Sequence, residues 1–334
     1  MSCLTRLSQV GKPRALKQFI KLPAIMGLFR KLRLILHIGP HKTGTTSLQK
    51  ALRKTYCTNK PKEIWYPKPA GPGPGHASLA LGIIEGSEHS VRRIIDEAAR
   101  ANCDTLILSS ESFARLAYEK RIEDLAEQTS AAQVHVVATL SPIYQRAVSS
   151  WQQGLKLGAW HTPIEQCLET VLARPGLRAD FMERFTEHFP AAKVSVLITN
   201  RSTPQDVFSR FAVATGISLS PPDEGLVENA SFGFVEVETV RAFHISAEAA
   251  GLPPDATREA GKLLRQLVKG EQWRALVPPQ RLKLPVNWIE PLAQRTAETI
   301  RRLRALESER RIEIFGELES LDDVECFRAD EQNA

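Results

Sequence analysis

The sequence predicts an α/β fold, an open parallel sheet flanked by helices on both faces. Short apolar segments rich in β-branched residues alternate along the chain with longer segments of helical periodicity. Each short segment is apolar almost throughout, as a strand must be when helices cover both faces of a parallel sheet. A turn rich in glycine and threonine follows the first of these segments and precedes the first helical one. A strand, a turn and a helix in this order indicate a binding site at that end of the sheet.

The expected strands all end near glycine, serine, asparagine or proline, which interrupt regular structure. They lie at residues 34–38, 105–108, 134–140, 194–199 and 311–315. The expected helices lie at residues 47–54, 91–101, 122–131, 143–157, 177–188, 204–215, 235–250 and 288–306. The last helix has apolar side chains on one face with arginines between them, the pattern of an amphipathic surface helix.

Three stretches break the alternation and are expected to be connectors, at residues 67–76, 218–231 and 278–285. The first contains so much proline and glycine that it cannot be regular structure. The sequence shows no internal repeat and no long low-complexity tract. We therefore expect one α/β domain with a helical C-terminal portion at residues 34–321, between a basic tail at residues 1–33 and an acidic tail at residues 322–334.

The charge of the chain lies mostly in these tails. Residues 1–33 hold eight Lys or Arg and no acid, so the net charge of +6 leaves −2 for the rest of the chain. A nearly neutral body argues against a broad nucleic-acid interface. The longest uncharged stretch of the basic tail, residues 22–29, contains a proline and is too short for a signal peptide or a membrane span. We expect a solvated tail, with weak contact to an acidic membrane surface as the alternative.

Five cysteines are scattered along the sequence, at Cys3, Cys57, Cys103, Cys167 and Cys326. Their odd number and wide spacing fit neither a disulfide framework nor a zinc cluster. We therefore expect a protein of a reducing compartment, the cytoplasm.

The glycine-rich turn, in LILHIGPHKTGTTSLQKAL at residues 34–52, nearly matches the phosphate-binding pattern G-x-x-x-x-G-K-[ST]. Gly39 and Gly44 have the required spacing, but Thr45 stands where the pattern has its lysine. The lysine of this loop, Lys42, comes before the second glycine instead. In a nucleotide triphosphatase the lysine after that glycine reaches the β- and γ-phosphates. The earlier lysine suits a donor with one phosphate in the loop and a single anionic group to transfer.

The loop and the start of the following helix would surround that phosphate with main-chain amides and hydroxyls. The residues expected to provide them are Thr43, Gly44, Thr45, Thr46 and Ser47. A tight turn that binds no ligand is the alternative interpretation.

At this loop the sequence resembles the bacterial branch of the sulfotransferases that use 3′-phosphoadenosine 5′-phosphosulfate (PAPS), whose 5′-phosphosulfate loop carries Lys-x-Gly-Thr-[ST]. The resemblance is carried by HIGPHKTGTTSLQ at residues 37–49 and, less specifically, by GHASLAL at 75–81, LILSSESF at 106–113, TLSPIYQRAVSSWQQ at 139–153 and FGELESL at 315–321. It implies a P-loop-like parallel sheet, PAPS as the donor substrate, a hydroxyl-bearing acceptor and no metal. The acceptor class stays open among carbohydrates, lipid head groups and small alcohols.

The same resemblance implies a second site, for the 3′-phosphate of the donor. The family uses an arginine at the end of a later strand and a serine about eight residues farther on. Ser149 matches the serine, but Ser141 stands where the arginine is expected. Arg146 is either a substitute for that charge or a solvated surface arginine.

Transfer of a sulfuryl group needs a cation where charge develops and a general base for the proton of the acceptor. Lys42 is the expected cation. Glu111, just past the second expected strand, is the first candidate for the base, unless it only follows a serine that caps a helix. His76 is the rival, because its proline- and glycine-rich loop would let it swing over the site. His41 is expected as a turn residue of the loop that holds the donor.

Two other functions remain alternatives at this stage. One is a nucleotide kinase on the same scaffold, which the position of Lys42 disfavours. The other is a non-catalytic nucleotide-binding protein that kept the loop and lost the 3′-phosphate site.

Overall fold

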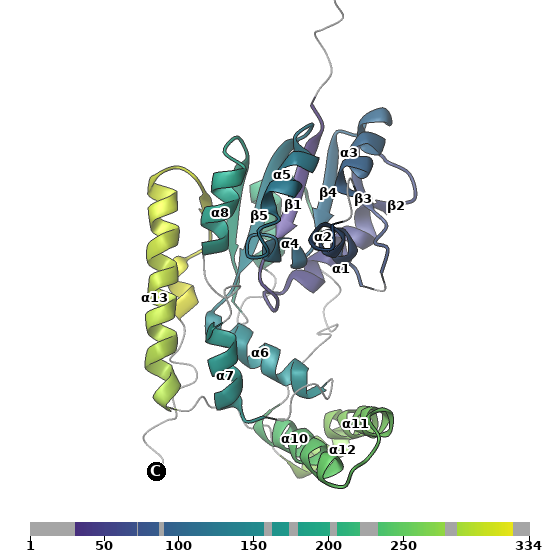
Figure 1. The fold of residues 1–334 in the computed structure, drawn as a ribbon, viewed down its shortest axis with the longest axis vertical. Coiled ribbons are helices and arrows are strands. Elements are labelled where there is room, and N and C mark those ends of the chain that lie inside the picture. The colour runs from purple at the N-terminus through teal and green to yellow at the C-terminus, as the bar shows by residue number, and fades with distance from the viewer. Residues whose placement is uncertain are drawn as a thin grey trace, which may run out of the picture. The chain divides into compact units, whose positions relative to one another are not determined.

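Seven parallel strands form one sheet in the order β2-β3-β4-β1-β5-β6-β7 in the computed structural model (Figure 1). The strands are β1 (Arg33–Ile38), β2 (Cys57–Thr58), β3 (Ile64–Pro67), β4 (Thr105–Ser109), β5 (Gln133–Leu140), β6 (Lys193–Ile198) and β7 (Glu313–Phe315). All five expected strands are present, and β2 and β3 were not expected. The predicted α/β architecture with a parallel sheet is confirmed.

The structure describes residues 31–71, 73–86, 90–156, 162–173, 180–200, 206–220, 233–277 and 286–322. They belong to the second of the two units into which the chain divides, Lys31–Ala334. The connector at 278–285, most of the one at 218–231 and nearly all of both tails lie outside these residues. Within them, no helix has the length and apolar character that crossing a membrane requires.

The helices that follow the strands include all eight that the sequence predicts. They are α1 (Thr45–Tyr56), α2 (Ala77–Ile84), α3 (Ser90–Arg100), α4 (Ser112–Arg115), α5 (Ile122–Thr129), α6 (Ile143–Lys156), α7 (Ile164–Ala173), α8 (Asp180–His188), α9 (Asp206–Thr215), α10 (Phe234–Ala249), α11 (Pro254–Lys269), α12 (Glu271–Leu276) and α13 (Val286–Ser308). The unexpected ones are α2, α4, α7, α11 and α12. A short 3₁₀ helix follows β7 at Leu318–Asp322.

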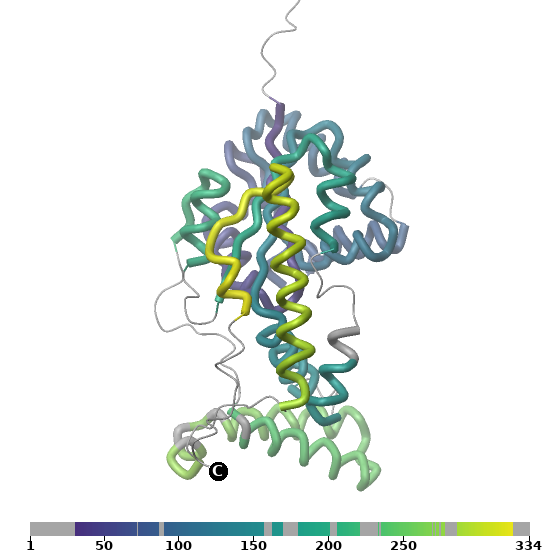
Figure 2. Tube along the Cα trace, turned by 90° about the vertical axis from the view of Figure 1, so that its left-hand side faces the viewer, coloured from purple at the N-terminus to yellow at the C-terminus, as the bar shows by residue number. Residues whose placement is uncertain are grey.

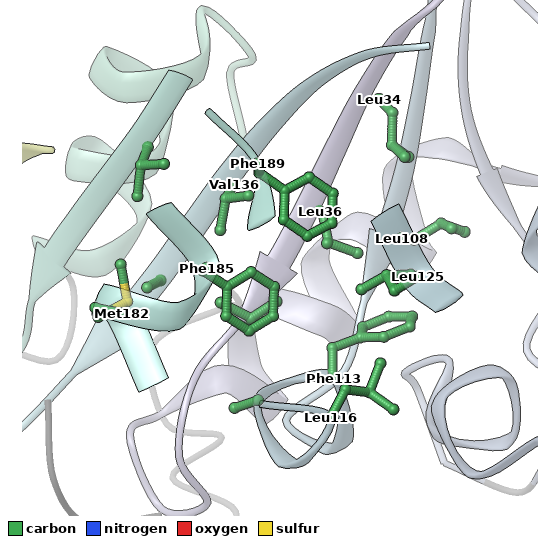
Figure 3. Close-up of a cluster of buried hydrophobic side chains, with 14 of the residues drawn as sticks. Leu34, Leu36, Leu108, Phe113, Leu116, Leu125, Val136, Met182, Phe185 and Phe189 are labelled. Carbon is green, nitrogen blue, oxygen red and sulfur yellow. The ribbon is translucent and has the colours of Figure 1, made fainter. Parts of the chain in front are cut away.

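Helices cover both faces of the sheet, and this explains why the side chains of its central strands are mostly apolar and buried. Alternate residues of β1 point to opposite faces, so Leu34 and Leu36 belong to one core cluster and Ile35 belongs to another. On the first face, Phe113 and Phe185 pack with the leucines over the sheet (Figure 3). On the other face the core is completed by α1 and α9, with side chains such as Leu48, Leu52, Phe208 and Phe211.

The order of the strands reverses at β1. The chain leaves β1 for the β2 edge, returns through β3 and β4, and then crosses to the other side of β1 to form β5. In open α/β sheets, ligands bind outside the carboxyl ends of the strands at such a reversal. The loop between β1 and α1 lies at this point.

The helical C-terminal portion packs around a third core cluster, which α6 joins directly after the carboxyl end of β5. Its buried side chains include Tyr144, Trp151, Val237, Val268 and Leu292. Helix α13 extends along both regions (Figure 2). Its Leu292 belongs to the helical cluster, and its Leu303 belongs to the core of the sheet.

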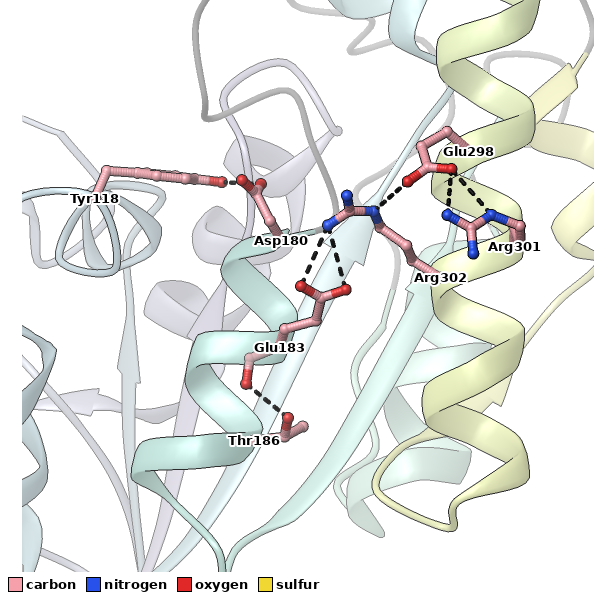
Figure 4. A network of polar contacts seen from close by, with 7 residues as sticks. All are labelled: Tyr118, Asp180, Glu183, Thr186, Glu298, Arg301 and Arg302. Carbon is pink, nitrogen blue, oxygen red and sulfur yellow. Dashed lines mark hydrogen bonds and ion pairs between the residues drawn. The ribbon is translucent and has the colours of Figure 1, made fainter.

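Polar contacts also join α13 to α8 beside the sheet (Figure 4). The guanidinium of Arg302 lies 3.2 Å from the carboxylate of Glu183 on α8 and 2.6 Å from that of Glu298 one turn earlier. These side chains are about one-third exposed, so each pair contributes about 1 kcal/mol or less. The apolar contacts of α13 therefore dominate its attachment.

Candidate functional site

The loop between β1 and α1 is shaped by three residues with positive φ. They are Gly39 at 156°, Lys42 at 72° and Gly44 at 80°. A Cβ atom at Gly39 would lie 2.7 Å from the carbonyl oxygen of Thr139, so only glycine lets this end of β1 lie against β5. Lys42 has a left-handed conformation that costs a residue with a Cβ atom about 1–2 kcal/mol. Such strain is concentrated at functional sites in proteins.

Helix α1 begins directly after Gly44, and the residues of its own first turn bring no negative charge there. No side chain caps its N-terminus, and its first turn contains no acidic residue. The first main-chain amides of a helix lack partners within the helix, and the helix dipole is positive there. This end of α1 is therefore suited to bind a phosphate.

The hydroxyl groups of the loop fall into two sets. Thr43 is buried and donates a hydrogen bond to the carbonyl oxygen of Pro40, 3.1 Å away. Thr45 is also buried and donates to the carboxylate of Glu111. Thr46 and Ser47 are exposed. The sequence predicts that all four hydroxyls surround a phosphate. In the structure only those of Thr46 and Ser47 are available for this, because those of Thr43 and Thr45 hold the loop together.

Glu111 faces this loop, as the sequence predicts. One carboxylate oxygen accepts the hydroxyl hydrogen of Thr45, and the other accepts a hydrogen bond from Nε2 of Gln49 at 3.3 Å. Burial by itself would raise the pKa of Glu111, but the hydrogen bonds from Thr45, its own main-chain amide and Gln49, together with the nearby His41, outweigh it and lower the pKa below its ordinary value. Glu111 is the N-cap residue of α4, but its side chain makes no cap hydrogen bond there, and the hydroxyl of Ser110 accepts the amide of Ser112 at 3.0 Å instead. The Glu111 carboxylate is therefore directed to α1.

His76 lies at the end of β4 but is not placed to swing over the loop. Its side chain is 2% exposed, its Nε2 lies 2.8 Å from the carbonyl oxygen of Pro67, and its Nδ1 accepts the amide of Ser109 at 3.1 Å. Burial lowers the pKa of His76 to about 4. Both ring nitrogens are occupied, so His76 ties the proline- and glycine-rich connector to the sheet. The expectation of a mobile His76 does not fit this geometry.

A second buried histidine, His37 in β1, was missed by sequence reasoning. Its Nδ1 lies 2.7 Å from the hydroxyl of Ser109 in β4, and its Nε2 lies 2.9 Å from the hydroxyl of Thr139 in β5. Burial lowers the pKa of His37 to about 4 although the nearby Glu111 carboxylate opposes this. The ring joins the three strands whose ends carry the site. The sequence signal that could have revealed this contact was a histidine, a serine and a threonine near the ends of three mostly apolar segments.

The residues expected at the 3′-phosphate lie at or just after the end of β5. Ser141 is buried, and its hydroxyl donates to the carbonyl oxygen of Lys42 at 3.4 Å. Arg146 is 2% exposed, and burial lowers its pKa to about 10 although the nearby Tyr118 opposes this. The alternative expectation, that Arg146 is a solvated surface arginine, is therefore wrong. Ser149 lies on α6 three residues after Arg146, and this spacing places both on one side of the helix.

His41 and Lys42 form the turn of the loop, and both are exposed. The structure thus brings together Lys42, Thr46, Ser47 and Glu111 around the start of α1, with Ser141 behind the loop. In the described part of the chain, no group of three or more His, Cys, Asp or Glu side chains is arranged to hold a metal.

Comparison of the chain with models of known protein families and with curated protein sequences finds no match. The function is therefore inferred from the geometry of this site and from the motifs of the sequence.

Proposed function

We propose that the protein is a sulfotransferase that moves the sulfuryl group of PAPS to a hydroxyl-bearing acceptor. The observation that supports this best is the loop itself. Its lysine comes before the second glycine, it precedes an uncapped helix, and it lies where the strand order reverses. A loop of this kind offers one phosphate a set of amides and places a single cation beside the group to be transferred.

In this proposal Lys42 stabilises the charge that develops on the 5′-phosphate oxygen as its bond to sulfur breaks. The amides at the start of α1 and the hydroxyls of Thr46 and Ser47 hold the phosphate. The left-handed backbone at Lys42 belongs to this role, because the turn presents its side chain at the surface in front of the helix.

The 3′-phosphate of the donor is assigned to Arg146 and Ser149 on α6. Arginine binds phosphate through charge-assisted hydrogen bonds, and burial strengthens them. Ser141 does not provide this charge and contacts the loop instead. The serine at position 141, where the resemblance predicts an arginine, favours a second candidate function, that of a nucleotide-binding protein without catalysis. Cys57 and Cys103 are free thiols, which fits the proposed cytoplasmic location.

Calorimetric titration tests the proposal with adenosine 3′,5′-bisphosphate, the product of the donor, against ATP with Mg²⁺. We expect the bisphosphate to bind better, and adenosine 5′-monophosphate to bind more weakly because it lacks the 3′-phosphate. A preference for ATP with Mg²⁺ would overturn the sulfotransferase in favour of a kinase. Transfer of label from PAPS to any acceptor distinguishes the enzyme from the non-catalytic binder.

The first variant to compare is Lys42→Met, which removes the cation and leaves the length of the side chain. A charge-assisted contact contributes about 1.5–3 kcal/mol to the binding free energy. Its loss should therefore lower the affinity for the bisphosphate by about tenfold or more. Lys54→Met, at an exposed lysine in the last turn of the same helix, is the matched control and should bind as the natural protein does. Equal affinities of the two variants would remove Lys42 from the site.

A further inference from the structure

Four side chains at this edge of the sheet have the chemistry of a general base: those of His37, His41, His76 and Glu111. His37 and His76 are buried, and each has both ring nitrogens in hydrogen bonds. Glu111 accepts one hydrogen bond at each carboxylate oxygen, and its pKa is lowered. A carboxylate held in this way is a weak acceptor for another proton.

His41 differs from the other three. It is exposed in the turn of the loop, one residue before Lys42, and no hydrogen bond of its ring is found among the described residues. His41 is thus the neighbour in sequence of the proposed cation, and no described residue holds its ring nitrogens in a hydrogen bond.

Three charged groups act electrostatically on the His41 ring. They are Glu111 after β4, Lys42 in the loop and Arg115 at the end of α4. Desolvation by the loop lowers the pKa of His41, the Glu111 carboxylate opposes this, and the two cations add to it. The lowered pKa favours the neutral ring, which is the form that can accept a proton. The Glu111 carboxylate would then stabilise the imidazolium that forms, as the carboxylate of a catalytic triad does.

We propose that His41 is the general base of the transfer and that Glu111 supports it electrostatically. This inference rests on the proposed function. In the step, the acceptor oxygen forms a bond to sulfur while its proton moves to a ring nitrogen of His41. The bond between sulfur and the 5′-phosphate oxygen breaks, and its electron pair stays on that oxygen beside Lys42. The products are the sulfate ester, adenosine 3′,5′-bisphosphate and a protonated imidazole.

The first test asks whether His41 lies beside the nucleotide and needs no acceptor. The ring signals of the histidines are followed by nuclear magnetic resonance over a pH series, and that of His41 is assigned by its loss in His41→Gln. Saturation with adenosine 3′,5′-bisphosphate should shift this signal and raise its titration midpoint, because a bound anion favours the charged ring. An unchanged midpoint at saturation would overturn the inference.

The second test uses water as the acceptor and measures release of labelled sulfate from PAPS. His41→Gln should slow release by about 10²–10⁴-fold, the usual contribution of a general base, while affinity for the bisphosphate, measured at a pH above the titration midpoint of the ring, stays unchanged. Glu111→Gln should have a smaller effect and should move the acid limb of the rate against pH. If His41→Gln binds the bisphosphate normally and releases sulfate at the rate of the natural protein, the role of His41 is overturned but the proposed sulfotransferase function is not. Failure of the natural protein to bind the bisphosphate would instead overturn the proposed function, and this inference with it.

Discussion

At the scale of single residues, Lys42 combines a proposed functional role with a strained backbone. Its φ of 72° is left-handed although the residue is not glycine. The strain costs about 1–2 kcal/mol, and glycine in its place would lose about 0.5–1 kcal/mol through the entropy of the unfolded chain. Lys42→Gly should therefore increase the free energy of unfolding by about 0.5–1 kcal/mol relative to Lys42→Ala.

Urea denaturation measures this difference, and calorimetry with adenosine 3′,5′-bisphosphate measures binding by the same two variants. Both should bind more weakly than the natural protein because both lack the cation. A residue that costs stability and contributes affinity is selected for binding rather than for the fold. Equal unfolding free energies of Lys42→Gly and Lys42→Ala would show that the turn stores no strain.

The residues of the loop could be predicted from the sequence, but their individual tasks could not. Glycines at a fixed spacing between a strand and a helix indicate a phosphate-binding loop whatever the rest of the fold. That Thr43 and Thr45 hold the loop while Thr46 and Ser47 are exposed depends on Pro40 and Glu111, which the fold places nearby. For the same reason the sequence did not reveal the role of His37 and suggested a wrong one for His76. Their hydrogen-bond partners lie far away in the sequence, and local spacing does not show them.

At the scale of elements, the connector at residues 67–76 supports the site through one glycine. A Cβ atom at Gly75 would lie 2.8 Å from the side-chain amide nitrogen of Gln49. Gly75→Ala should therefore displace Gln49 and remove one hydrogen bond from Glu111. Since that bond helps to lower the pKa of Glu111, the pKa should rise in the variant.

Carboxyl resonances of the labelled protein measure this rise. The control is Gly73→Ala, because a Cβ atom at Gly73 meets nothing within 4 Å. The added Cβ atom would meet the end of the Gln49 side chain and not the backbone, so the unfolding free energy of Gly75→Ala should change by only about 0.5–1.5 kcal/mol, the contribution of a hydrogen bond. If Glu111 titrates identically in both variants, the connector does not act on the site through Gln49.

The elements that sequence reasoning missed are those with little local pattern. Strand β2 has two residues and β3 has four, too few for a periodicity to emerge. Helix α11 begins with a segment, PDATREAGK, that contains no large apolar side chain, although its later Leu264 and Val268 pack on the helical core. Tertiary packing stabilises such a helix more than its own sequence does.

At the scale of the whole molecule, three buried histidines make stability depend on pH. They are His37, His76 and His135; the last lies in β5, with its Nε2 2.9 Å from the hydroxyl of Ser195. Burial lowers the pKa of each to about 4 in the folded protein, whereas histidine in an unfolded chain titrates near about 6.5. Between these values the unfolded chain binds more protons, so the free energy of unfolding falls as the pH is lowered.

The expected loss at pH 5 is about 2 kcal/mol for each histidine relative to pH 7. Urea denaturation at the two pH values measures the total, and a variant such as His135→Gln should reduce it by about a third. His135 serves this purpose because it lies at the amino half of the sheet, away from the loop. A free energy of unfolding that is the same at both pH values would contradict the burial of neutral histidines.

The pairing of β7 with β6 has a consequence for the nascent chain. Between Ile198, the last residue of β6, and Glu313, the first of β7, the ribosome adds 114 residues. Until then Ser195, Val196 and Leu197 lack the partner strand that later pairs with them. Unpaired strand edges invite association between chains, and slow long-range pairing prolongs that exposure. Late in translation, the three residues of β7 cover the open edge of β6. Without them, growing chains held close together on a polysome could associate through that edge.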